Sequence, residues 1–264
     1  MSSNSSLDNA TLGRLLVASD VDYFESAAEN SHCLGGVLSL TTGFPDLSLA
    51  CVLHSLTDID DIESWIRQLE AIIPATGSRW ARFYLQNVCD RERACLLKKG
   101  YRELVELGFA TTLDTRTFGT MELKVCQSEA DWQQYTRLSL LSGQGPDGFD
   151  MAGDSYVRVS RLKVDAGYMT PYLAVLCNRV VGFVNLSLQG DFARCKNLLV
   201  HPEHRDQGVG SIIVKAAMMV AREQGARYIG CYAIAGEPSV ALYSGLGMVE
   251  VTRQFEWSKD LSAT

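Results

Sequence analysis

The hydrophobic positions in the first half of the chain change their spacing several times, and each change predicts a new element. Residues 47–56 are mostly apolar and β-prone and predict a buried strand, and residues 79–85 predict another. Between them, Thr57 or Asp58 is the expected cap of a helix. The apolar face of that helix comprises Ile59, Ile62, Trp65, Ile66, Leu69, Ile72 and Ile73. A further helix is expected over residues 91–99.

The second half repeats this succession of elements. Residues 195–200 and 227–234 predict strands, and residues 239–243 predict a short helix. Between the two strands lies a helical pattern that is closed by Gly225. The apolar face of this helix comprises Val209, Ile212, Ile213, Ala216, Ala217 and Val220.

Glycines and histidines recur in the two halves at a nearly constant distance of 147 or 148 positions. The corresponding pairs are His54 and His201, Gly77 and Gly225, and Gly100 and Gly247. We interpret this as an internal duplication that divides the chain within the polar stretch 112–121, into domains 1–117 and 118–264. The alternative is that two α/β segments share ordinary turn signals. Strands alternating with helices predict an α/β or α+β sheet in each half.

Composition narrows the range of partners. The chain has 264 residues and a net charge of −7, which argues against nucleic acid or an anionic membrane. Residues 1–20 contain no long apolar run, so we expect neither a signal peptide nor a spanning helix. The eight cysteines include no Cys-x-x-Cys pair, which indicates a reducing, cytoplasmic setting. His201 and His204 have no further histidine or cysteine nearby, so we expect no metal.

The strongest candidate site is the loop Arg205-Asp206-Gln207-Gly208-Val209-Gly210, between a strand and the start of a helix. The first amides of a helix lack internal partners, and the helix dipole adds positive charge there. Gly208 and Gly210 have no Cβ, so a diphosphate can approach the backbone closely. Arg205 adds a fixed charge, and the Ser211 hydroxyl is a further donor.

Two other kinds of phosphate loop fit this segment less well. It has no Gly-Lys-Ser/Thr ending, so it is not a nucleoside-triphosphate loop. It also lacks the third glycine of a Rossmann fingerprint, because Gly210 is followed by Ser211, Ile212 and Ile213. On spacing alone, an arginine and two glycines also fit a purely structural turn.

The loop has a wider sequence context. Residues 197–211 read NLLVHPEHRDQGVGS, residues 238–248 read PSVALYSGLGM, and residues 172–188 read YLAVLCNRVVGFVNLSL. In this order and spacing they resemble the GNAT superfamily of acetyl-coenzyme A dependent N-acetyltransferases, over roughly residues 121–257. The resemblance implies a mixed, mostly antiparallel twisted central sheet flanked by helices, the acyl-CoA N-acyltransferase fold. The repeat implies that this fold is duplicated.

The resemblance assigns roles to individual residues. The main chain of Leu198, Leu199 and Val200 would pair with the pantetheine arm of acetyl-CoA, the co-substrate. The pyrophosphate would be held by the amides of Asp206, Gln207, Gly208, Val209, Gly210 and Ser211. The Tyr243 hydroxyl would protonate the departing thiolate, since a phenol with a pKa near 10 supplies a proton rather than removes one. The alternative makes Tyr243 a packing aromatic.

The sequence also departs from the family pattern. Arg194 occupies the position where some members have a glutamate base, and Gly236 stands where many have asparagine. In the first half, the position of the phosphate loop carries Asp58, Asp60 and Asp61, which would repel a pyrophosphate. This half is therefore expected to be a degenerate copy without coenzyme, the alternative being an unrelated α/β domain.

The amine acceptor is not identified by the sequence. Family analogy places it near residues 132–165, where Asp147, Asp150 and Asp154 lie in a glycine-rich stretch that either receives a cationic amine or is simply a solvated loop. We expect a small-molecule or peptide amine as partner, and a monomer or homodimer. The expected reaction is direct acetyl transfer. The alternatives are a catalytically silent acyl-CoA-binding module and a transferase with a longer acyl donor.

Overall fold

The chain divides into two compact units, and each is built from two separate stretches of sequence. The computed structural model describes residues 7–57, 59–113, 121–141 and 154–263. The first unit comprises residues 1–19 and 107–252, and the second comprises residues 20–106 and 253–264. Three elements pass from one unit into the other: α1 (Asn9–Glu25), β5 (Arg102–Thr112) and β11 (Val249–Asp260).

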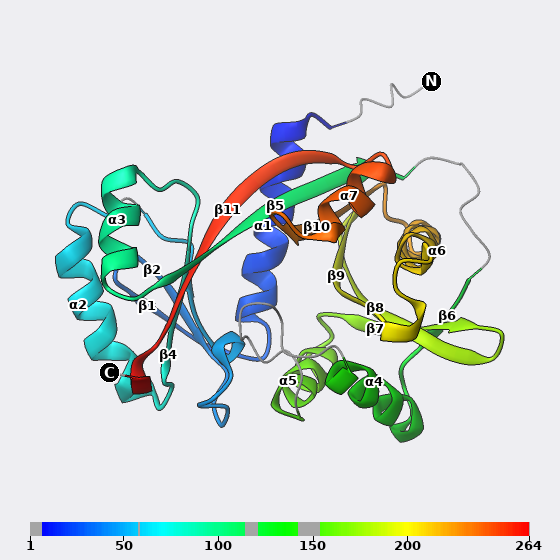
Figure 1. Cartoon of the computed structure of the whole chain (residues 1–264), viewed down its shortest axis with the longest axis horizontal. Coiled ribbons are helices and arrows are strands. Elements are labelled where there is room, and N and C mark those ends of the chain that lie inside the picture. Colours follow the sequence, from blue (N-terminus) through cyan, green and yellow to red (C-terminus); the bar gives the residue numbers. More distant parts are fainter. Residues whose placement is uncertain (1–6, 58, 114–120, 142–153, 264) are drawn as a thin grey trace. The chain divides into compact units, whose positions relative to one another are not determined.

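The first unit is a sheet with helices packed against it (Figure 1). Its strands are β6 (Glu122–Val125), β7 (Thr170–Leu176), β8 (Arg179–Gln189), β9 (Phe192–Val200) and β10 (Tyr228–Ile234), together with the end of β5. Its helices include α4 (Glu129–Leu141), α5 (Asp154–Asp165), α6 (Val209–Glu223) and α7 (Pro238–Gly245). The strand order is β5-β10-β9-β8-β7-β6. Neighbouring strands from β6 to β9 are antiparallel, whereas β9 and β10 are parallel.

Helix α6 packs against β8 and β9 through its apolar face. Four of the six residues predicted for this face are buried: Val209, Ile213, Ala216 and Ala217. Val214 and Met218 are buried as well, so the buried face is broader than the predicted one. The approach to the sheet is close at Gly182 of β8, where an added Cβ would lie 2.3 Å from the Leu199 carbonyl oxygen and 2.8 Å from Ile213 Cδ1.

The second unit has its own sheet and core. Its elements are β1 (Glu29–Cys33), β2 (Gly36–Leu40), β3 (Cys51–His54), α2 (Ile62–Ile72), β4 (Trp80–Leu85) and α3 (Asp90–Lys98). The strand order is β1-β2-β3-β4-β11-β5, with β11 antiparallel to β4. Helices α2 and α3 lie side by side in Figure 1. The core includes Leu53, Ile66, Phe83 and Trp257, which are fully buried.

Two predicted boundaries in this unit were wrong. The stretch 47–56 is not one strand, because residues Ser48–Ala50 form a 3-10 turn before β3. Helix α2 is capped by Asp61 rather than by Thr57 or Asp58, and Ile59 lies outside it. The cap is decided by hydrogen bonding, since the Asp61 carboxylate accepts from the amides of Glu63 and Ser64, at 3.1 and 3.2 Å.

The two halves of the sequence contain the same seven elements in the same order, strand-strand-strand-helix-strand-helix-strand. In the first half they run from β1 to β5, and in the second half from β7 to β11. Helices α2 and α6 begin at residues 62 and 209, and helices α3 and α7 begin at residues 90 and 238. Their starting positions therefore lie 147 and 148 residues apart, which matches the spacing of the landmarks in the sequence. In the described part of the chain, every helix is too short or too polar to cross a lipid bilayer.

Candidate functional site

A cavity of about 540 Å³ runs along the end of β9 in the first unit. One wall is formed by residues 197–200 of β9, another by the loop and helix start over 204–206 and 208–211, and a third by residues 237–239 and Leu242 at α7. All the predicted cofactor-binding residues line this cavity except Gln207. The Gln207 side chain instead donates a hydrogen bond to the Glu203 carbonyl oxygen, at 2.8 Å, and so closes the loop on itself.

The cavity exists because β9 and β10 separate. Their parallel ladder holds only three pairs and ends at Arg194 and Gly230. On its other side β9 stays paired with β8, with Leu199 opposite Phe183 and Val200 opposite Gly182. The main chain of residues 198–200 therefore has one edge held by β8 and one edge facing the cavity. An open strand edge of this kind can pair with an extended, amide-bearing ligand.

The loop before α6 presents main-chain amides at the outer end of the cavity. Gly208 is the N-cap of α6 and has no side chain to cap it, and the first hydrogen bond into the helix runs from the Ile212 amide to the Gly208 carbonyl, at 3.2 Å. The amides of Val209, Gly210 and Ser211 precede that bond, so they lack an acceptor within the helix. Asp206 and Gly208 have φ of 59° and 75°, the alternation that gathers successive amides into an anion-binding nest.

Arg205, Gly208 and Gly210 are each explained by a different structural feature of the loop. Arg205 Nε donates to the Val200 carbonyl oxygen at 3.2 Å, which ties the exposed guanidinium to the end of β9. Gly208 requires a positive φ, whereas an added Cβ at Gly210 would lie 2.9 Å from Leu242 Cδ1. A side chain at Gly210 would therefore push the end of the Leu242 side chain aside, whereas Gly208 is required by the positive φ of the turn before α6.

Tyr243 lies on α7 beside the cavity but is not one of its lining residues. Its side chain is 5% exposed, and its ring centroid lies 6.0 Å from that of Phe109. Burial raises the pKa of Tyr243 well above its ordinary value, and its hydroxyl shares a hydrogen bond with the Cys231 thiol. The phenol therefore keeps its proton at neutral pH, and the adjacent residue Leu242 faces the cavity.

The neighbours of Tyr243 provide neither a base nor a thiolate nucleophile. Arg194 is buried, with its guanidinium carbon 4.7 Å from the centroid of the Tyr232 ring, and a guanidinium does not remove protons at neutral pH. Burial raises the pKa of Cys195 to about 12 and raises the pKa of Cys231 well above its ordinary value. Both thiols stay protonated, so a covalent acyl-cysteine route has no activated group here.

The cavity is also lined by polar and aromatic side chains that the sequence did not single out. Ser139 of α4, Tyr156 of α5 and Phe183 of β8 line it. The Tyr135 ring stacks on Phe183 at a centroid distance of 4.0 Å, and Asn185 Nδ2 donates to the Tyr135 hydroxyl at 3.1 Å. No motif marks these residues, because they meet only through the packing of α4 and α5 on the sheet.

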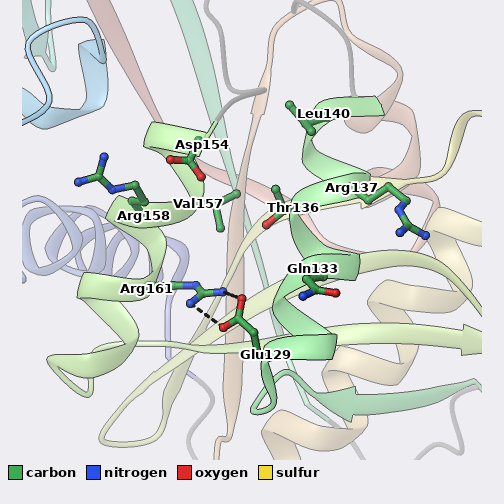
Figure 2. Close-up of a pocket in the computed structure, with 9 residues that line it drawn as sticks. All are labelled: Glu129, Gln133, Thr136, Arg137, Leu140, Asp154, Val157, Arg158 and Arg161. Atoms are coloured by element: carbon green, nitrogen blue, oxygen red, sulfur yellow. Dashed lines mark hydrogen bonds and ion pairs between the residues drawn. The ribbon is translucent and has the colours of Figure 1, made fainter.

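A second cavity, of about 500 Å³, lies between α4 and α5 (Figure 2). Glu129 and Arg161 form two hydrogen bonds across it, at 2.9 and 3.0 Å. Arg137 and Arg158 also line it but point away from each other in Figure 2, so their charges do not converge on one ligand. Asp154 lines this cavity too, whereas the predicted acidic residues Asp147 and Asp150 lie outside the described residues.

The two histidines of the loop are neighbours. The rings of His201 and His204 have centroids 5.8 Å apart, and His204 lines the main cavity. His201 Nδ1 accepts a hydrogen bond from the Glu203 amide at 3.3 Å, so it acts as the cap of the short turn Pro202–His204. Among the described residues, no three histidine, cysteine or acidic side chains gather in a way that would hold a metal ion.

Comparison with known proteins agrees with this geometry. Residues 135–248 match the Acetyltransferase (GNAT) family. A conserved protein of unknown function from Staphylococcus epidermidis is similar in structure, with a TM-score of 0.70 and 13% identity over 89% of this chain and 95% of that one. A GCN5-related N-acetyltransferase from Kribbella flavida has a TM-score of 0.66 and 11% identity, over 94% and 95% of the two chains.

A third similar structure is a tandem GNAT protein from the clavulanic acid biosynthesis pathway, with a TM-score of 0.53 and 12% identity over 96% of this chain and 97% of that one. No curated protein matches the chain. At these identities the structural likeness establishes the fold. Residues 135–248 thus match the GNAT family model, and the fold is the mixed, mostly antiparallel sheet with flanking helices that the sequence predicted.

Proposed function

We propose that this chain transfers an acetyl group from acetyl-CoA to the amine of a small molecule or peptide. The observation that carries the proposal is the single cavity that joins the open edge of β9 to the uncapped amides of α6. An acyl-coenzyme A needs both features, since its pantetheine arm carries amides and its pyrophosphate carries charge.

The coenzyme is proposed to bind as an added strand that ends in an anion site. The pantetheine amides pair with the main chain of Leu198, Leu199 and Val200. The pyrophosphate rests on the amides between Asp206 and Ser211, with Arg205 at the rim. The supporting geometry is the nest around Gly208 and the exposure of this loop.

The chemistry follows from the same arrangement. The uncharged amine attacks the thioester carbonyl carbon, the tetrahedral intermediate collapses by breaking the carbon–sulfur bond, and the sulfur leaves with the electron pair. Tyr243 gives its proton to that thiolate, the proton lost by the amine goes to water, and the Tyr243 phenolate takes a proton back from water before the next turnover. Because burial raises its pKa, Tyr243 is protonated before the reaction, and the donor role rests on its place on α7, next to the cavity-lining Leu242.

The first half of the chain, residues 1–117, is proposed to be a degenerate copy with a structural role. Its α2 corresponds to α6, but the first amides of α2 are occupied by the Asp61 carboxylate. A pyrophosphate would have to displace that carboxylate against charge repulsion. The matching element order of the two halves and the likeness to a tandem GNAT protein support the duplication.

The test combines binding with turnover. Acetyl-CoA should raise the melting temperature of the chain, and release of free thiol should then be followed with polyamines, amino acids, aminoglycosides and peptide N-termini. Thiol release with one of these amines supports the proposal. A thermal shift without release from any of them indicates a silent binding module, and faster release from propionyl- or longer acyl-CoA indicates a different donor.

A further inference from the structure

Asn197 of β9 has an unusual backbone conformation for a residue inside a strand. Its φ is 58°, in the left-handed region that residues other than glycine, asparagine and aspartate seldom adopt. Residues held in such conformations cost free energy and concentrate at functional sites. Asn197 also lines the main cavity, directly next to the residues proposed to pair with the coenzyme.

The strain at Asn197 produces a bulge in β9. Lys196 pairs with Asn185 and Leu199 pairs with Phe183, so two residues of β9, Asn197 and Leu198, stand opposite one residue of β8. The bulge lies beyond the end of the β9–β10 ladder at Arg194, where the neighbouring strand has already left. Bulges re-aim a side chain, and this one lies where Asn197 lines the cavity.

The carboxamide has an unused donor. Asn197 Nδ2 is buried and has no hydrogen-bond partner within the described residues. A buried amide donor is ordinarily paired, and leaving it unpaired destabilises the protein. Because the terminal torsion of asparagine is broad, the carboxamide can turn its donor toward the cavity that the residue lines.

The position of Asn197 along β9 indicates which ligand atom it meets. From the loop inward, the cavity is lined in turn by Val200, Leu199, Leu198 and Asn197, at about 3.3 Å per residue. If the pyrophosphate binds at the loop, the acyl end of the coenzyme must lie at the inner end of this row.

We propose that the side-chain amide of Asn197 donates a hydrogen bond to the carbonyl oxygen of the thioester. This inference rests on the proposed function, because it assumes an acyl-coenzyme A in the cavity. The amide keeps its proton throughout the reaction. It pairs with the carbonyl oxygen of the bound donor and pairs more strongly as that oxygen becomes negative in the tetrahedral intermediate.

The test compares two ligands that differ only at the carbonyl, acetyl-CoA and S-ethyl-coenzyme A, by calorimetric titration. Asn197→Gly keeps the positive φ and removes the carboxamide, and Asn197→Asp keeps the shape and removes the donor. Asn178→Gly is the matched control, because Asn178 has a φ of 59° in the β7–β8 turn. A net hydrogen bond corresponds to a preference of about two- to tenfold.

We expect the wild type and Asn178→Gly to prefer acetyl-CoA, and both Asn197 variants to lose that preference while binding the thioether as the wild type does. An unchanged preference in both Asn197 variants, with unchanged melting temperatures, would overturn the inference and leave the proposed function intact. If the wild type binds neither ligand, the proposed function fails together with the inference. If it binds both equally, only the role of Asn197 fails.

Discussion

Asp61 and Gly208 occupy the same position in corresponding helices, 147 residues apart, and they have opposite effects on the amides beyond them. Each is the N-cap of its helix, α2 for Asp61 and α6 for Gly208. The Asp61 carboxylate accepts hydrogen bonds from the amides of Glu63 and Ser64, whereas Gly208 has no side chain and leaves the following amides open. The residue at this one position thus distinguishes the self-capped helix α2 from the proposed anion site at α6.

Asp61→Ala is predicted to weaken the second unit without changing coenzyme binding. Loss of an N-cap costs about 1 kcal/mol of unfolding free energy, because two first-turn amides lose their acceptor. Denaturant unfolding measures this cost, and titration with acetyl-CoA should give the wild-type affinity. A marked loss of coenzyme affinity would show that the second unit takes part in binding.

Tyr243→Phe is predicted to lower kcat by about a hundredfold or more while leaving the affinity for acetyl-CoA unchanged. The substitution removes only the hydroxyl that is proposed to protonate the leaving thiolate. Tyr172→Phe is the control, because the Tyr172 hydroxyl accepts a hydrogen bond from Gln224 at 2.8 Å, away from the main cavity. Equal turnover of the two variants across pH, in a thiol-release assay with a working acceptor, would make Tyr243 a packing residue.

His54 is predicted to make the chain less stable in mild acid. Burial lowers the pKa of His54 to about 4, against the opposing effect of Asp20, while an unfolded histidine has a pKa near 6.5. Above pH 6.5 the ring is neutral in both states, so its contribution is constant. As the pH falls from 6.5 toward 4, the unfolded chain binds the proton first, and roughly 3 kcal/mol of stability is lost.

The variant that checks this pH dependence is His54→Gln. It should flatten the fall in unfolding free energy between pH 6.5 and 4, although it also disturbs the hydrogen bonds that link His54 with Ser39 and Ser55, of 2.7 and 3.0 Å. His32→Gln, at an exposed position of β1, should keep the wild-type slope. If all three proteins have the same slope, His54 does not account for acid destabilisation.

Much of the fold could be predicted from the sequence because its signals are local. The apolar face of α6 was predicted from the helical spacing of its apolar residues, and the end of the helix from the glycine that follows it. The fold class followed from the GNAT resemblance. The start of α2 was misplaced because three aspartates compete for one cap, and only hydrogen bonding selects Asp61. Periodicity does not distinguish between such neighbours.

The remaining features depend on pairings between distant segments. The ladder of β9 and β10 ends at Arg194 and Gly230, and nothing in either strand alone marks that point. The bulge at Asn197 arises from its register with β8, so the sequence CKNLLV reads as an ordinary strand. Strands β5 and β11 each have residues in both units, and this too depends on packing between distant segments.

The most direct test of the account is a calorimetric titration of acetyl-CoA into the wild type, Gly208→Asp and Gly225→Asp. Both glycines have positive φ, of 75° and 98°, and open space around an added Cβ, so both substitutions force a non-glycine residue into the left-handed region without a steric clash. Only Gly208→Asp places a carboxylate at the N-cap, as Asp61 does in α2. We predict that it weakens acetyl-CoA binding at least tenfold while Gly225→Asp binds as the wild type; equal binding by all three would contradict the account.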